Sequence, residues 1–150
     1  MNIQSVQEQI IKEFSVVDDW TERYKLIIKL GSTLPPFPEH ERRDANLVKG
    51  CQSQVWLVAE QDDEGNIIFL ADSDAAITKG LVALMVKFYS GQQPDTIINT
   101  QPDFINEIGM AQHLSPTRAN GLVAMIKQMK IYAMAYKAKN LSSNTNTSGS

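Results

Sequence analysis

Apolar residues recur every three or four positions in four stretches of the chain, which is the spacing of one face of an α-helix. These stretches begin near Ile3, after Asp19, near Ile77 and after Ser115. In that order, the apolar positions are Ile3, Val6, Ile10 and Phe14; Trp20, Tyr24, Ile27 and Ile28; Ile77, Leu81, Leu84, Met85 and Phe88; and Leu122, Met125, Ile126, Met129 and Tyr132 or Ala133. The pattern predicts four amphipathic helices, each with one buried face.

Residues that favour the start of a helix precede three of these stretches. Asp19 suits the N-cap of the second predicted helix, and either Ser73 or Asp74 suits that of the third. Ser115 followed by Pro116 suits the start of the last, because proline at the first helical position lacks only an amide that would be unpaired anyway.

Gly80 lies inside the third predicted helix, where glycine costs about 1 kcal/mol relative to alanine. Its presence indicates close backbone packing at that point. Residues 92–112 carry shorter and broken signals, with Pro94 and Pro102 each able to begin a turn of helix. Two small helices are expected there.

Between the second and third helices the apolar period changes from 3.6 to two. Val55, Leu57 and Ala59 alternate with Gln54, Trp56 and Val58, as a pleated strand requires. Residues 61–66 are turn formers, 67–71 return as a second strand, and 45–49 can form a short strand before the first. The sequence therefore predicts an α+β fold with a small antiparallel three-stranded sheet packed with helices.

The length and composition of the chain bound its domain organisation. With 150 residues and 43% hydrophobic content, it is long enough for one core and short for two. We expect a single domain over residues 1–139. Residues 140–150 are polar, small and aperiodic, so a disordered tail is expected there.

The formal net charge of −3 lacks the basic excess that binding to nucleic-acid phosphates needs. No nucleic acid is therefore expected as a partner. The longest apolar run, residues 81–86, is far too short to span a membrane, and the first residues resemble no secretory signal. We expect a cytoplasmic protein with no membrane partner.

Cys51 is the only cysteine, and the strand pattern places it at a turn. Gly50 fits a turn because glycine reaches positive φ at little steric cost. A buried cysteine that behaves as a small hydrophobe is the alternative interpretation. The small or polar neighbours Gly50, Gln52 and Ser53 instead favour a thiol that another molecule can reach.

This stretch resembles the signature of the SufE family, the sulfur-accepting partners of cysteine desulfurases in iron–sulfur cluster assembly. The matching run is Val48-Lys49-Gly50-Cys51-Gln52-Ser53-Gln54-Val55-Trp56-Leu57. Further blocks lie in family order over about residues 14–134, namely Asp19-Trp20, Arg23-Tyr24, Ala71-Asp72-Ser73-Asp74-Ala75, Lys79-Gly80-Leu81 and the run from His113 to Leu122. The joint pattern is highly specific.

The resemblance implies an architecture shared with iron–sulfur scaffold proteins, with Cys51 on a loop at the edge of the sheet. It also implies that Cys51 accepts sulfane sulfur as a persulfide, and that the protein stimulates the desulfurase and passes sulfur to a downstream iron–sulfur scaffold complex. Pyridoxal phosphate (PLP) would belong to the PLP-dependent cysteine desulfurase, so no cofactor and no metal are expected on this chain. Whether the chain forms a homodimer stays open.

Arg118 falls in the first turn of the last predicted helix, where a cation opposes the helix dipole by about 0.3 to 1 kcal/mol if exposed. A guanidinium at that place can hold an anion such as a carboxylate, a thiolate or a persulfide. An ordinary surface ion pair is the alternative. The resemblance favours a binding site that includes Arg118 and Asn120 beside Gly50, Gln52 and Ser53.

Other functions compete for Cys51. A cysteine hydrolase needs a base beside the thiol, yet nothing in the sequence places His40 or His113 there. A zinc site from these three residues lacks any short ligand spacing, and cluster scaffolds need several thiolates. A module that activates a desulfurase by docking alone, with Cys51 incidental, is the main competing function.

Overall fold

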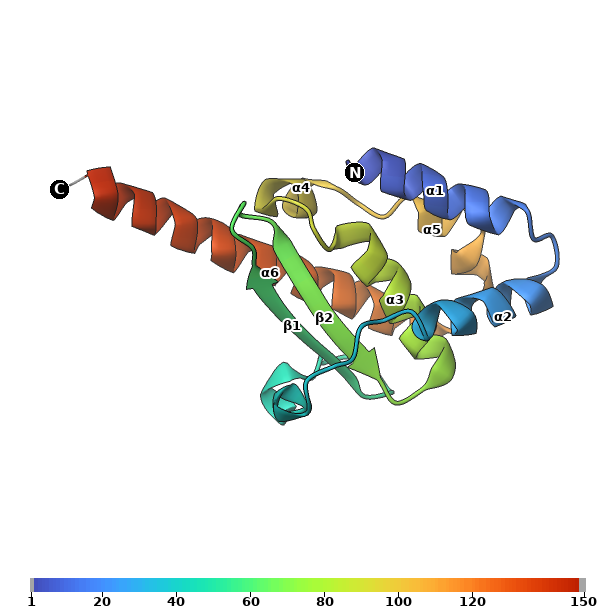
Figure 1. Cartoon of the computed structure of the whole chain (residues 1–150). Helices are drawn as coiled ribbons and strands as arrows, with labels where there is room; N and C mark the ends of the chain where they lie inside the picture. Colours follow the sequence, from blue (N-terminus) through green and yellow to red (C-terminus); the bar gives the residue numbers. More distant parts are fainter. Residues whose placement is uncertain (1, 149–150) are drawn as a thin grey trace.

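A two-stranded antiparallel sheet lies among helices in the computed structural model, which describes residues 2–148 and side chains up to Ser142 (Figure 1). The order of elements is α1 (Ile3–Ser15), α2 (Trp20–Gly31), the 3-10 turns η1 (Glu39–Glu41) and η2 (Asp44–Asn46), β1 (Val55–Gln61), β2 (Ile67–Ser73), α3 (Ala76–Tyr89), α4 (Pro94–Asn99), α5 (Phe104–Glu107), the 3-10 turn η3 (Met110–His113) and α6 (Pro116–Ser148). The predicted α+β class is confirmed.

The four amphipathic helices expected from the apolar pattern correspond to α1, α2, α3 and α6. The Asp19 carboxylate accepts a hydrogen bond from the Thr21 amide at 3.0 Å and so caps α2. At the start of α6, the Ser115 hydroxyl accepts from the Arg118 amide at 3.3 Å. Two of the predicted caps are therefore confirmed.

The cap predicted for α3 is wrong, because the N-cap of that helix is Ala75 and no side chain caps it. The Asp74 carboxylate instead accepts from the Gln54 amide at 3.0 Å, a residue that precedes β1. The Gln54 amide, distant in sequence, thus takes the place of the nearby helix amide as the partner of Asp74. The sequence next to a helix start does not reveal such a distant partner.

The predicted third strand is also wrong, since the described residues form two strands only. Asp44–Asn46 is a 3-10 turn, and Leu47 makes a single bridge to Trp56. The Val48 amide donates to the Val55 carbonyl at 2.8 Å, after which Gly50 turns the backbone away. The residues before Cys51 therefore touch the edge of β1 without running along it.

Two tyrosines of α6 occupy the rest of this edge. The Tyr132 hydroxyl donates to the Leu57 carbonyl at 3.1 Å, and the Tyr136 hydroxyl donates to the Ala59 carbonyl at 2.9 Å. The carbonyls of Val55, Leu57 and Ala59 point to the same side, because alternate residues of a strand do so. Side chains four residues apart lie on the same face of a helix, so two tyrosines spaced by four on α6 can reach two carbonyls spaced by two on β1. The edge of β1 is satisfied by α6 where a third strand was expected.

One face of the sheet is buried, and it carries the apolar residues that the period of two predicted. Val55 and Leu57 of β1 join Ile67, Phe69 and Ala71 of β2 there, with α3 packed against β2. The strands pair in register from Val55 opposite Ser73 to Gln61 opposite Ile67. Figure 1 shows α6 running past the sheet and projecting beyond it.

Helices α2 and α3 approach each other closely at Gly80. A Cβ added at Gly80 would lie 2.0 Å from the Ile27 carbonyl oxygen, which no side chain can tolerate. The close backbone packing predicted from this glycine is confirmed. Two small helices, α4 and α5, also lie in residues 92–112 as expected, together with η3.

No helix in the described part of the chain is long and apolar enough to cross a membrane. The structure describes α6 up to Ser148, and Gly149 and Ser150 of the predicted tail lie outside the described residues. The division into a domain over residues 1–139 and a disordered tail over 140–150 stays a prediction.

Substitution of Gly80 by alanine tests the contact between α2 and α3. Gly80→Ala should lower the free energy of unfolding by about 3 kcal/mol, because the helices must separate to admit the methyl group. Urea unfolding followed by circular dichroism measures the loss. Gly31→Ala is the matched control, since its Cβ would meet the Gly80 nitrogen at 3.1 Å and should cost less. A wild-type midpoint for Gly80→Ala would contradict the packing.

Candidate functional site

The backbone geometry around Cys51 begins at Gly50. Gly50 has φ of 98°, in the left-handed region where residues with a Cβ are strained, as the sequence predicted for a turn. Beyond Cys51, the Gln54 amide donates to the Asp74 carboxylate, and the Asp74 amide donates to the Gln54 carbonyl at 3.3 Å. These bonds fix the end of the loop over residues 49–54, and the bond from the Val48 amide to the Val55 carbonyl fixes its start. Cys51 lies between these two attachments.

The Cys51 loop crosses α6 at two small residues. A Cβ added at Gly121 would lie 3.4 Å from Cys51 Sγ, and one added at Gly50 would lie 3.2 Å from the Ala124 methyl group. The thiol donates to the Gly121 carbonyl with an Sγ to oxygen distance of 3.5 Å. The loop therefore rests directly on the backbone of α6, which only small side chains at 121 and 124 permit.

A cavity of about 550 Å³ opens beside the thiol, next to the N-terminal turns of α6. We call it the Cys51 cavity. Its apolar wall comes from the first turns of α3 and from α6, and includes Ile77, Leu81, Val82, Leu122 and Met125. Its polar wall is made by Gln52, Ser53, Ser115, Thr117 and Arg118.

Arg118 lines the Cys51 cavity together with Cys51 itself, and its side chain is exposed. It makes no ion pair with any carboxylate in the residues that the structure describes, so the surface ion pair considered from the sequence is absent there. A guanidinium without an ion pair at the mouth of a cavity with one apolar wall can bind an anion in two-point geometry.

Burial controls the reactivity of the thiol. Cys51 is half-buried, and this desolvation raises the pKa of its thiol above the ordinary value. A smaller fraction of Cys51 is then ionised near neutral pH than for an exposed cysteine, and the thiolate is the reactive form. The isolated protein thus holds its thiol in a weakly reactive state.

The other residues expected at the site fall in different places. Gln52 and Ser53 line the cavity, and Gly50 lies in the loop against α6. Asn120 is exposed and does not line the cavity. His40 and His113 do not line it either, and the His113 ring stacks on Trp20 with centroids 3.9 Å apart. The described residues give Cys51 no imidazole neighbour.

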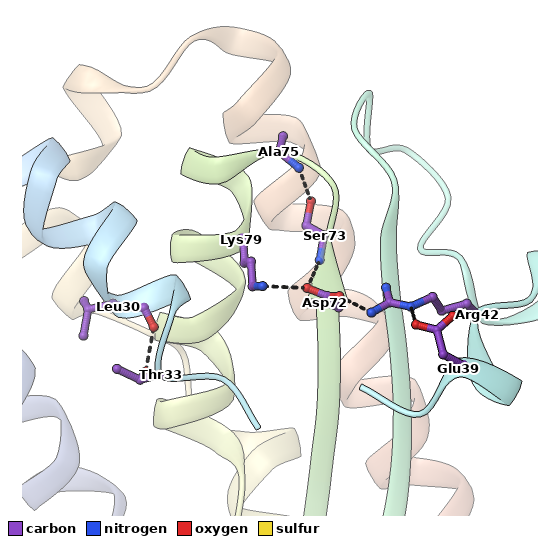
Figure 2. Close-up of polar contacts among 8 residues, drawn as sticks. All are labelled: Leu30, Thr33, Glu39, Arg42, Asp72, Ser73, Ala75 and Lys79. Atoms are coloured by element: carbon purple, nitrogen blue, oxygen red, sulfur yellow. Dashed lines mark hydrogen bonds and ion pairs between the residues drawn. The ribbon is translucent and has the colours of Figure 1, made fainter. Parts of the chain in front are cut away.

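A buried ionic cluster, which the sequence did not predict, supports the segment that leads to the loop (Figure 2). Asp72 of β2, only 9% exposed, binds Arg42 at 2.6 Å and Lys79 of α3 at 3.3 Å, and accepts from the Ser73 amide at 2.8 Å. Burial alone would raise the pKa of Asp72, but these hydrogen bonds outweigh it and lower that pKa.

Arg42 itself joins the segment before the Cys51 loop to the sheet. Its guanidinium lies 5.3 Å from the centroid of the Phe37 ring and 5.1 Å from that of Trp56, and it also binds Glu39 at 2.8 Å. Although residues 39–44 are dense in charge, Arg42 is therefore held against the sheet and is not simply solvated. The feature of the sequence that could have revealed this contact is Asp72, the lone acid in an otherwise apolar strand, because a buried carboxylate needs a cationic partner.

The pH dependence of thiol labelling tests the burial of Cys51. The rate of alkylation should rise with pH to a midpoint above the value of about 8.5 for a free cysteine, because burial raises the thiol pKa. The same protein in denaturant serves as the control and should titrate near the free value. A folded midpoint equal to or below the denatured one would show that the thiol is not desolvated.

Known proteins resemble this chain in both sequence and fold. Residues 8–133 match the model of the SufE family, described as an Fe-S metabolism associated domain. The fold is similar to the solution structure of a hypothetical protein from Thermus thermophilus, with a TM-score of 0.73, 18% identity and coverage of 89% of this chain and 96% of that one. At this identity the second match bears on the fold alone. The first covers most of the chain, which therefore belongs to the SufE family and carries a domain associated with iron–sulfur metabolism.

Proposed function

We propose that Cys51 accepts sulfane sulfur from a PLP-dependent cysteine desulfurase as a persulfide, and that the protein stimulates this desulfurase and passes the sulfur to iron–sulfur cluster assembly in the cytoplasm. The observation that carries the proposal is the position of the thiol. Cys51, the only cysteine of the chain, is half-buried on a glycine-turned loop beside a cavity that also exposes an unpaired arginine.

The transfer needs no oxidant and no base of high strength. The Cys51 thiolate attacks the outer sulfur of the donor persulfide, a bond forms between the two sulfurs, and the donor S–S bond breaks. The electron pair of that bond leaves with the donor thiolate, which takes up a proton. The transferred sulfur keeps its oxidation state, so a modestly reactive thiol is sufficient.

The raised thiol pKa suits a carrier that must not react before its partner arrives. The apolar wall of the Cys51 cavity would shelter the added sulfur from water and small thiols. Arg118 lies where it could stabilise either the anionic persulfide or a carboxylate of the docked desulfurase. Closure of the cavity by that partner would provide the second half of the site.

Mass spectrometry of the intact protein tests the acceptor role. After incubation with a cysteine desulfurase and cysteine, wild type should gain the mass of one or more sulfur atoms, removable by a reductant, whereas Cys51→Ser should gain none. The same Cys51→Ser variant distinguishes the competing docking module, because a module would still stimulate the desulfurase without its thiol. Absence of the adduct on wild type would remove the carrier role.

Replacement of Arg118 tests its contribution to the site. Arg118→Ala should retain or slightly raise stability, by about 0.3 to 1 kcal/mol, because it removes a cation from the first turn of α6. Persulfide loading should fall, and Arg118→Lys should restore it only in part because lysine lacks the two-point geometry. Stability and loading are measured on the same preparations.

Lys12→Ala is the matched control for this experiment. Lys12 is an exposed cation on α1 with no ion pair in the described residues, it does not line the Cys51 cavity, and α1 packs against α3 and α5. Loading at the wild-type rate by Arg118→Ala would restrict the site to the cysteine loop alone.

A further inference from the structure

A second hollow of about 430 Å³ lies on the opposite side of the Cys51 loop from the Cys51 cavity. We call it the Lys127 groove. It is lined by residues 45–47, Lys49 and Leu57, and on α6 by Ala124, Lys127, Gln128, Ile131 and Tyr132. We propose that this groove docks a segment of the sulfur-exchanging partner protein in which carboxylates accompany apolar side chains.

The two hollows are separated by the point where the loop rests on α6. The Cys51 cavity includes α6 residues from Thr117 to Met125, and the Lys127 groove includes those from Ala124 to Tyr132. Lys49 belongs to the loop itself and faces the second hollow. A partner seated in the groove would therefore touch the segment that carries Cys51 without filling the space beside the thiol.

The floor of the groove is fixed before any partner binds. The Tyr132 hydroxyl donates to the Leu57 carbonyl, which holds α6 to the edge of β1. Burial, together with Glu41 and Tyr136, raises the pKa of Tyr132, so the hydroxyl stays protonated and keeps this bond across the physiological range. A groove that needs no rearrangement loses less conformational entropy on binding.

The charge of the groove points to an acidic partner. Lys49 and Lys127 form no ion pair with any carboxylate in the described residues, and α6 contains no acidic residue over 116–148. Of the other α6 cations, Lys137 pairs with Asp95, Lys130 donates to the Ile98 carbonyl and Arg118 lines the Cys51 cavity. The nearby acids Glu41 and Asp44 do not line the groove, and Glu41 pairs with Arg43 at 3.4 Å. Two lysines without an ion pair in the described residues are thus left in the groove of a chain whose formal net charge is −3.

Exposed apolar side chains accompany these cations. Ile131 in the groove is 42% exposed, and Val123 and Met134 on the same face of α6 are 65% and 48% exposed. Spacings of eight and three residues place all three on one side of the helix. Apolar residues between unpaired lysines are complementary to a segment that presents apolar side chains between carboxylates.

A second copy of the chain is a poorer occupant, because α6 against α6 would bring cations together. The identity of the partner as the protein that exchanges sulfur rests on the proposed function. The groove itself does not, since its shape and charge are independent of what Cys51 carries.

The test compares charge reversals inside and outside the groove. Binding of the full chain to a purified, PLP-loaded cysteine desulfurase that acts with a SufE-family protein is measured at about 50 and about 300 mM salt. The double variant Lys49→Glu/Lys127→Glu should bind about tenfold more weakly at low salt, with a smaller difference at high salt. Ile131→Ala should weaken binding several-fold at both salt concentrations.

The matched control is the double variant Lys12→Glu/Lys29→Glu. Both of these exposed lysines lack an ion pair in the described residues, and neither lines the groove, so binding should change less than twofold. At saturating desulfurase, Lys49→Glu/Lys127→Glu should still load Cys51 near the wild-type rate, because the thiol and Arg118 are intact. The defect then lies in binding and not in transfer.

The outcomes separate the two proposals. Equal weakening by both double variants, or none by the groove variant, would overturn the groove while leaving the Cys51 persulfide unaffected. Loss of the persulfide on wild type with weakened binding by the groove variant alone would overturn the sulfur transfer and keep the groove. A wild-type dimer in light scattering that Lys49→Glu/Lys127→Glu dissociates would assign the groove to a second copy and overturn the proposed occupant.

Discussion

The hydrogen bonds from α6 to the free edge of β1 determine how the Cys51 loop lies relative to the first turns of α6, which carry Arg118. A two-stranded sheet leaves a row of carbonyls without partners, and each such group costs about 1 to 3 kcal/mol if buried unpaired. Tyr132 and Tyr136 satisfy two of them, and the Val48 amide satisfies a third. The helix is thereby fixed along the strand in one register, which also closes an edge that would otherwise be open to pairing with another chain.

That register brings distant parts of the chain to the thiol. With Tyr132 held at Leu57, the α6 residues three turns earlier meet the loop that precedes β1, and Gly121 lies under Cys51. Arg118, one further turn toward the start of α6, then lies at the mouth of the cavity. A Cβ at position 121 would already contact Cys51 Sγ, so a longer side chain there would crowd the loop and disturb the burial that raises the pKa of the thiol.

The sequence predicted the elements better than their tertiary partners. Four helices and two strands followed from apolar periods, and the close contact at Gly80 followed from a glycine inside a helix. The predicted third strand failed because tyrosines some 75 residues away occupy the edge of β1, and no local pattern encodes that pairing. Asp74 failed as a helix cap for the same reason, since the Gln54 amide outcompetes the local one. Cys51 and Arg118 could be singled out, but their shared cavity required the fold.

The loop geometry separates two demands that conflict in a sulfur carrier. A thiol that rests on Gly121 and opens toward the Cys51 cavity is protected, yet protection alone would make it hard for a partner to reach. A recognition surface on the other side of the same loop relieves this conflict, because a partner bound at Lys49 and Lys127 is held next to the segment that carries Cys51 and leaves the cavity beside the thiol open. Because Lys49 lies in the segment that leads to Cys51, a partner held in the Lys127 groove is placed beside the thiol without having to occupy the Cys51 cavity, so binding and sulfur transfer depend on different residues.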